Sequence, residues 1–98
     1  MKKYAILLMN PAFDTEKDHA CFWADGIEHH ILTIRCEQDA VKKASELADA
    51  GFGAIEVCGA FGEELARKMY DAAGHRLTVG YVTYPRDQEE ANARFWES

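Results

Sequence analysis

Short apolar runs of strand length alternate along this chain with segments whose apolar residues recur at helical spacing. The first run, Tyr4–Met9, is continuously apolar, which is typical of a strand buried on both faces of a parallel sheet. Further strand patterns lie at Ile27–Arg35, Gly53–Cys58 and Leu77–Tyr84. Because strands that alternate with helices pair in parallel through right-handed crossovers, the pattern predicts an α/β fold.

Three segments predict helices. Glu37–Ala50 and Gly62–Ala73 both carry apolar residues at the i, i+3, i+4, i+7 spacing. Asp87–Trp96 follows the last strand pattern and begins on a residue that caps helices well. A short helix is also expected around Glu16–Phe22, in the long connection between the first two strands.

With 98 residues, the chain is expected to form a single domain over residues 1–98. A crossover in each connection predicts a short open parallel sheet of about four strands in the order 2-1-3-4. This is a flavodoxin-like sheet shortened by one strand, and we expect helices on both of its faces.

Composition excludes some partners and compartments. The formal net charge of −6 repels phosphate backbones, so a nucleic-acid partner is not expected. No apolar stretch approaches the ~20 residues that span a membrane. The three cysteines, Cys21, Cys36 and Cys58, are odd in number and form no Cys-x-x-Cys pair. This usage favours a reducing, cytoplasmic location over a disulfide framework.

Ligands of open parallel sheets bind beyond the carboxyl ends of the strands, where the winding reverses. In the order 2-1-3-4 that point lies between strands one and three, so the segments Asn10–Asp14 and Cys58–Gly62 should meet there. Backbone N–H groups at a strand-to-helix turn favour an anion. The alternative is that the glycines only permit a tight turn and close packing. The residues expected to line a ligand site are Asn10, Phe13, Gly59, Ala60, Phe61 and Gly62.

Glu56 and Cys58 are the candidate catalytic residues, because both precede that turn and share a face of the same strand. A carboxylate on a covered central strand is costly unless it is paired, and such groups often serve as an acid or a base. A thiol that ends a strand before a helix can be a nucleophile or a redox-responsive group. The alternatives are a structural ion pair of Glu56 with Arg35, Arg76 or a histidine, and a Cys58 that packs as a small hydrophobe.

The histidines form no metal signature in the sequence. His29 and His30 are adjacent in a strand pattern and point to opposite faces, so they cannot chelate one ion together. We therefore expect no metal site, and the sequence identifies no cofactor. Arg35 and Arg86 lie near the carboxyl ends of strands two and four, where they either orient an anionic substrate or are ordinary surface charges.

Two large aromatic residues, Phe95 and Trp96, lie near the end of the sequence and need burial, on their own sheet or on a second copy. An open sheet also leaves two edges to be covered. A homodimer is therefore expected. Two functions stay open. One is the binding or chemical conversion of a small molecule, with an anion as one option, at the carboxyl edge of the sheet, and the other is a non-catalytic oligomeric or regulatory module.

The stretch Glu56–Gly62, together with the opening strand and Asn10–Asp14, resembles a family of small bacterial and archaeal proteins, domain-of-unknown-function family 6506. The resemblance covers nearly the whole chain. In that family the corresponding stretch is Glu, an apolar residue, Cys, Gly, a small residue, Phe and Gly. The resemblance implies an α/β fold and a role for this loop, and it brings no established activity. The positions it emphasises are Glu56, Cys58, Gly59, Phe61 and Gly62.

Overall fold

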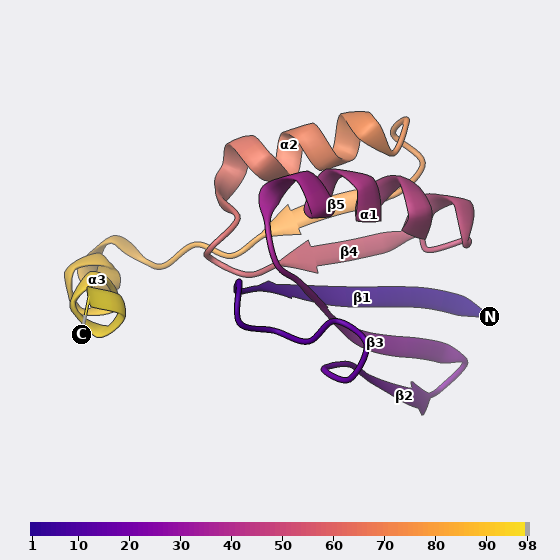
Figure 1. Ribbon diagram of the computed structural model, residues 1–98, viewed down its shortest axis with the longest axis horizontal. Helices are drawn as coiled ribbons and strands as arrows, with labels where there is room; N and C mark the ends of the chain where they lie inside the picture. The colour runs from indigo at the N-terminus through magenta and orange to yellow at the C-terminus, as the bar shows by residue number, and fades with distance from the viewer. Residues whose placement is uncertain (98) are drawn as a thin grey trace.

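The computed structural model describes residues 1–97 and shows a five-stranded sheet with two helices packed on it and a third helix beyond its end (Figure 1). The strands are β1 (Lys2–Met9), β2 (Ala20–Ala24), β3 (Ile27–Ile34), β4 (Ala54–Val57) and β5 (Thr78–Tyr81). The helices are α1 (Glu37–Asp49), α2 (Gly62–Ala72), the short 3-10 helix η1 (Arg86–Gln88) and α3 (Glu89–Glu97). The fold is therefore mixed α/β, as predicted.

The strands lie in the order β2-β3-β1-β4-β5. Strand β1 pairs in parallel with β3 and β4, and β4 pairs in parallel with β5. The four strands predicted from the sequence thus follow one another as expected, in the order β3-β1-β4-β5. The sheet differs from the prediction by a fifth strand, β2, which pairs antiparallel with β3 at the edge.

The prediction of a short helix around Glu16–Phe22 is wrong, because the second part of this connection forms β2. Only two residues, Asp25 and Gly26, join β2 to β3, with φ angles of 52° and 77°. Two successive positive φ angles are the geometry of a type I′ hairpin turn, which Asp-Gly favours. The aromatic residues Phe22 and Trp23 lie in this edge strand and are 60% and 65% exposed.

The prediction of helices on both faces is also wrong for the described chain. Helix α1 links β3 to β4 across β1, and α2 links β4 to β5, so both crossovers run in the same direction across the sheet. Right-handed crossovers in one direction place their helices on one face, where α1 and α2 contact each other (Figure 1). The crossover from β1 to β3, which would cover the other face, contains strand β2 instead of a helix. We call this other face, which carries Tyr4, Ile6, His29, Ile31 and Glu56, the open face.

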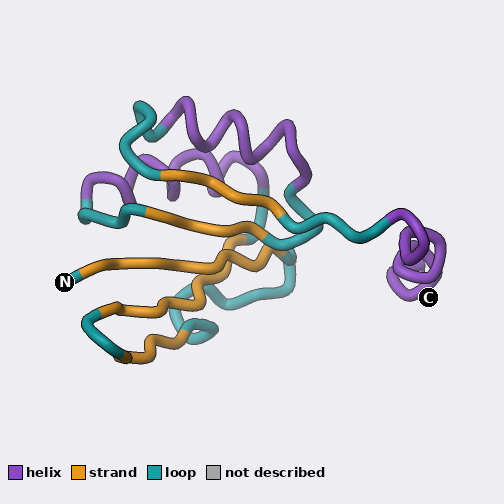
Figure 2. The backbone as a smooth tube through the Cα atoms, turned by 180° about the vertical axis from the view of Figure 1, so that it is seen from behind, coloured by secondary structure: helices purple, strands orange, loops and turns teal. Residues whose placement is uncertain are grey.

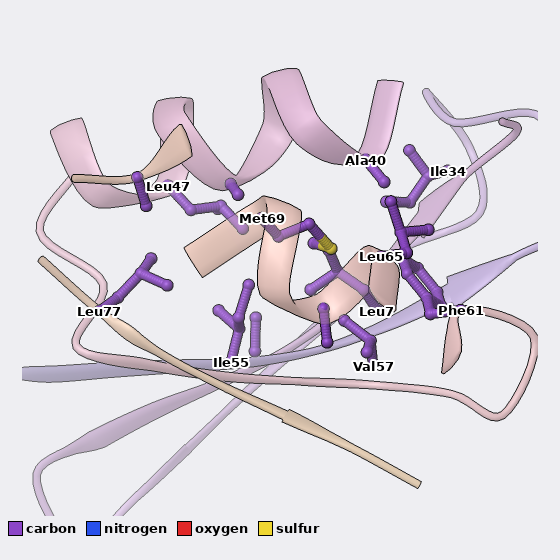
Figure 3. Close-up of a cluster of buried hydrophobic side chains, with 14 of the residues drawn as sticks. Leu7, Ile34, Ala40, Leu47, Ile55, Val57, Phe61, Leu65, Met69 and Leu77 are labelled. Atoms are coloured by element: carbon purple, nitrogen blue, oxygen red, sulfur yellow. The ribbon is translucent and has the colours of Figure 1, made fainter. Parts of the chain in front are cut away.

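The hydrophobic core lies between the sheet and the two helices α1 and α2. Leu7, Ile55 and Val57 of the central strands and Met69 of α2 are at most 1% exposed, and their side chains lie close together between the layers (Figure 3). Strand alternation explains which residues take part. In β4, Ile55 and Val57 face the helices, while Glu56 faces the opposite way and is exposed.

Helix α3 lies apart from the sheet, beyond the carboxyl ends of the strands (Figure 2). Its main contact is with η1. Phe95 and Trp96 pack edge to face with ring centroids 4.9 Å apart, and they are 68% and 72% exposed. Burial of these rings on their own sheet, one of the two expected possibilities, therefore does not occur. No helix within residues 1–97 is both long enough and apolar enough to cross a membrane.

Candidate functional site

A surface cavity of about 620 Å³ opens at the carboxyl ends of β1, β3 and β4. It lies beside the point between β1 and β4 where the strand order reverses, which is where open α/β sheets bind ligands. The loop after β1, the β3–α1 junction and the β4–α2 turn each contribute to its wall. The lining residues are Met9, Pro11, Arg35, Cys36, Glu37, Gln38 and Ala60.

Arg35 is the cationic group of this cavity. It directly follows β3, and its Nε donates a hydrogen bond to the carbonyl oxygen of Pro11 at 2.8 Å. A main-chain bond from Asn10 N to Ile34 O at 3.0 Å joins the same two segments beside it. Within residues 1–97, no carboxylate forms an ion pair with Arg35. The remaining guanidinium N–H groups are therefore available to an anion.

Helix α1 begins at the cavity without a capping side chain. Its N-cap residue, Cys36, is extended and its thiol makes no capping bond, so the N–H groups of the first turn have no intrahelical or capping partner. The partial positive charge of this helix end adds to that of Arg35. Glu37 lines the same wall with a carboxylate. The cavity thus suits a ligand that carries both an anionic group and a hydrogen-bond donor.

Of the turn Cys58–Gly62, which was expected to supply most of the site, only Ala60 lines the cavity. Phe61 is 7% exposed and belongs to the core (Figure 3). Cys58 is half-buried and packs against the same core. Gly62 has a φ of 76°, a conformation that favours glycine, at the first residue of α2. The structure thus gives Phe61 and Gly62 structural roles.

The loop after β1 reaches the cavity through Pro11. Asn10 and Phe13, which were expected to contact a ligand, lie in the same loop and are not part of the lining. The side-chain oxygen of Asn10 accepts a hydrogen bond from Ala12 N at 2.9 Å, which is a local turn interaction typical of asparagine. Asn10 therefore shapes the loop that presents Pro11.

Glu56 is exposed on the open face and does not line the cavity, which corrects the expectation of a carboxylate on a covered strand. Strand β4 is internal, but only one of its faces is packed. The partner of Glu56 is the hydroxyl of Tyr4, which donates to Oε1, and not Arg35, Arg76 or a histidine. Tyr4 lies diagonally across on β1, because Ile6 is the register partner of Glu56. This hydrogen bond, then burial, then the charge of Glu56 raise the pKa of Tyr4 to about 12.

Comparison with protein-family models identifies the chain. The model described as "Family of unknown function (DUF6506)" matches residues 2–97. The chain belongs to the DUF6506 family. Neither the curated proteins nor the solved structures contain a match to it. Membership in this family brings no activity with it.

A second hollow, of about 710 Å³, extends in this DUF6506 protein from the amino edge of the sheet onto the open face. Tyr4, His29 and Ala54 line its part on the open face. Within residues 1–97, Nδ1 of His29 is buried without a hydrogen-bond partner. A buried polar atom left in this state is destabilising. An occupant of the hollow that bonds to His29 would remove that cost.

Sequence reasoning missed the part that the first turn of α1 plays in the site of this DUF6506 protein. Glu37 and Gln38 were interpreted only as the beginning of a helix, and Cys36 only as one of three reduced cysteines, whereas the three residues form one wall of the cavity. The available signal was the position of Arg35, at a strand-to-helix junction of the strand expected next to β1. Arg86, the other arginine considered, lies in η1 and does not line the cavity.

Proposed function

We propose that this protein binds a small anionic molecule in the cavity at the carboxyl edge of the sheet. The observation that carries the proposal is Arg35, which is fixed at the cavity by Pro11 and is beside the uncapped first turn of α1. A phosphate or carboxylate would accept charge-assisted hydrogen bonds from the guanidinium and further bonds from the helix N–H groups. Glu37 on the same wall favours a ligand that also carries a donor group.

The proposal is for binding, since neither predicted catalytic residue lines the cavity. Glu56 lies on the open face and accepts a hydrogen bond from Tyr4, and Cys58 packs against the core. Catalysis by these two residues stays a prediction. It would need a substrate that extends out of the cavity to reach them.

The first test is titration calorimetry and thermal unfolding with phosphate- and carboxylate-bearing metabolites, starting with inorganic phosphate and citrate. A ligand should raise the Tm by mass action. Arg35→Gln should weaken its binding about 10- to 100-fold, because a hydrogen bond to a charged group contributes about 1.5–3 kcal/mol. Arg86→Gln is the matched control and should leave the affinity unchanged, because η1 contributes nothing to the cavity wall.

A second test fills the cavity. Ala60 is exposed and lines it, so Ala60→Trp should block the ligand while the free energy of unfolding changes little. If a ligand keeps its full affinity in both Arg35→Gln and Ala60→Trp, it binds elsewhere and the proposed site is wrong.

A second candidate function is a non-catalytic oligomeric module, a homodimer in which α3 of each copy covers the open face of the other. Helix α3 projects beyond the end of the sheet (Figure 2), with Trp96 72% exposed. The open face of the same chain carries Ile6 and Ile31, and no helix among the described residues covers it. The segment 82–85 leads α3 away from its own sheet (Figure 1), so a second copy is the occupant that the geometry favours.

The hollow on the open face supports the same arrangement. At the carboxyl end of this face, Thr33 Oγ1 donates to the carbonyl oxygen of Asp18 at 2.7 Å, so the loop before β2 already covers that end. The amino end of the open face remains uncovered, and there His29 Nδ1 has no hydrogen-bond partner among the described residues. Helix α3 offers both apolar rings and polar groups, including Asn92. A reciprocal exchange of α3 would form a two-fold symmetric dimer, the commonest oligomeric arrangement.

A further inference from the structure

The β2–β3 hairpin brings together three side chains of different chemistry, away from the carboxyl-edge cavity. Cys21 on β2 is the register partner of His30 on β3. Glu28 lies two residues before His30, on the same face of the strand. Nε2 of His30 is 3.6 Å from Sγ of Cys21 and 2.9 Å from Oε1 of Glu28. One ligand atom from each residue lies within 4.8 Å of the other two.

We propose that Cys21, Glu28 and His30 bind a divalent transition-metal ion, with Zn²⁺ as the best fit. Thiolate sulfur, imidazole nitrogen and carboxylate oxygen are the three kinds of ligand that Zn²⁺ takes in proteins. Mg²⁺ and Ca²⁺ prefer oxygen ligands alone, so this mixed set selects against them. The thiolate and the carboxylate together carry two negative charges, which a divalent ion neutralises.

Two of the three distances between the ligand atoms can be compared with those of a tetrahedral site. Zn–S and Zn–N bonds of about 2.3 and 2.05 Å at tetrahedral angles place sulfur and nitrogen about 3.5 Å apart. The observed separation of Cys21 Sγ and His30 Nε2 is 3.6 Å. Nitrogen and oxygen ligands would be about 3.4 Å apart, so Glu28 and His30 have to separate by roughly half an ångström.

The surroundings hold this cluster in place. The two-residue turn at Asp25 and Gly26 fixes the hairpin register that sets Cys21 opposite His30. The ring of His30 packs edge-on against Phe52 with centroids 5.0 Å apart. The side chains of Glu28 and His30 are only 14% and 22% exposed. Cys21 is exposed, which gives an ion access and leaves the fourth coordination position to water, as in zinc sites with three protein ligands.

The lysine opposite Glu28 on the neighbouring strand does not pair with the Glu28 carboxylate. Lys3 is the register partner of Glu28 on β1, but its Nζ donates to the carbonyl oxygen of Ala50 at 2.9 Å. Among the described residues, the ion-pair partner of Glu28 is His30. The competing interpretation is a simple Glu28–His30 hydrogen bond with Cys21 close by. The two interpretations differ in whether the cluster binds a metal ion with Cys21 as one of its ligands.

The test is a titration of the reduced, chelator-treated full chain with Co²⁺ and then Zn²⁺. Cobalt bound to a thiolate gives a sulfur-to-metal charge-transfer band, and we expect this band to saturate at one ion per chain and to be displaced by Zn²⁺. Cys21→Ser should abolish the band. It should also weaken Zn²⁺ binding by about 100-fold or more, because losing even an outer-shell partner of a ligand costs 10- to 100-fold.

Matched controls come from the same chain. Cys58→Ser and His29→Gln remove a thiol and an imidazole outside the cluster, so the band and the Zn²⁺ affinity should persist in both. His30→Gln should weaken binding as Cys21→Ser does. If His30→Gln fails to fold, Cys21→Ser still tests the proposal, because the Cys21 side chain is exposed and its replacement should leave the fold intact. Persistence of the band in Cys21→Ser, a stoichiometry of one ion per two chains, or equal binding of Mg²⁺ would each overturn the proposal.

A second readout is independent of cobalt absorbance. Trp23 is the register partner of Glu28, and the chain has two tryptophans. In a Trp96→Phe background, Co²⁺ bound at the cluster should quench the fluorescence of Trp23 with the same midpoint as the charge-transfer band. Quenching that stays unchanged in the Cys21→Ser variant of this background would place the ion elsewhere. Neither outcome bears on the anion cavity, which shares no residue with this cluster.

Discussion

Tyr4 donates its hydroxyl hydrogen to the carboxylate of Glu56, so ionisation of Tyr4 would place two negative charges side by side. The pKa of Tyr4 rises from 10.0 to about 12, through the hydrogen bond first, then burial, then the charge of Glu56. In the unfolded chain, Tyr4 ionises near its ordinary pKa. The interaction therefore stabilises the fold fully below about pH 10, and this stabilisation is lost as the pH rises from about 10 to about 12.

This pair gives a prediction for tyrosine titration. The tyrosinate absorbance of the wild type should contain a component with a midpoint at about pH 12 that is missing in Tyr4→Phe. In Glu56→Gln the midpoint of Tyr4 should fall toward 10, because the amide carries no charge. Tyr84→Phe serves as the control and should retain the high-pH component. A midpoint that does not move in Glu56→Gln would mean that the carboxylate is not the cause.

At the level of single residues, the sequence predicted which side chains share a face of a strand but not what those side chains contact. Strand alternation correctly separated Glu56 from Ile55 and Val57, but it could not tell which side of the sheet the helices would cover. Side-chain contacts between neighbouring strands could not be predicted either, because they depend on the register in which the strands pair. The Tyr4–Glu56 bond and the Cys21–His30 pair both arise from pairing that no local pattern specifies. The absence of a metal motif in the sequence therefore did not exclude a cluster of three potential ligand side chains across a hairpin.

At the scale of elements, four strands and the two helices that pack on the sheet were predicted, with ends that differ by a few residues. The predicted strand Leu77–Tyr84 is shorter in the structure, where β5 covers Thr78–Tyr81, because its extent depends on the length of its partner β4. The error over Glu16–Phe22 has a different cause. Aromatic residues there suggested a packed helix, whereas the Asp-Gly turn that follows is a hairpin signal.

Two glycines in the β4–α2 turn, Gly59 and Gly62, allow a matched test of whether backbone conformation at the start of α2 limits stability. Gly62 has a φ of 76°, and a Cβ there would meet no atom within 4 Å, so the cost of a side chain is conformational. Gly62→Ala should lower the free energy of unfolding by about 1–2 kcal/mol, the penalty of the left-handed region.

Gly59 is the control for that substitution. It has no positive φ and open space around its Cβ position, so Gly59→Ala should change stability by no more than about 0.5 kcal/mol. Urea denaturation of both variants measures the difference. Equal effects of the two substitutions would show that backbone conformation at Gly62 does not limit the turn.

For the whole molecule, the direction of the two helical crossovers determines which face of the sheet is covered. Because α1 and α2 cover one face, the chain keeps an open face with apolar residues and a C-terminal helix that packs mainly on η1. The relative order of the four predicted strands matches the flavodoxin-like order that was expected from strands alternating with helices. The surface on which α3 packs could not be predicted. The sequence does not distinguish burial of its aromatic residues on the same chain from burial on a second copy.

If α3 completes the open face of a second copy, light scattering should give twice the chain mass at micromolar concentration, with dissociation on dilution. Trp96→Ala should shift the equilibrium toward monomer by 10-fold or more, since buried tryptophans at interfaces commonly contribute about 2 kcal/mol or more. Trp23→Ala is the control: Trp23 is comparably exposed, at 65%, but its register partner Glu28 faces away from the open face.

A truncation separates exchange between copies from folding back on the same chain. Deletion of residues 86–98 removes η1 and α3, whose main contacts are with each other, so the remaining domain should stay folded and become monomeric. Ile31 lies in the middle of the open face, which is the surface that α3 of the second copy would cover. Ile31→Asp should therefore also abolish the dimer. If the wild type is monomeric and the deletion lowers its free energy of unfolding by several kcal/mol, α3 packs on its own chain in solution, and the exchanged dimer is wrong.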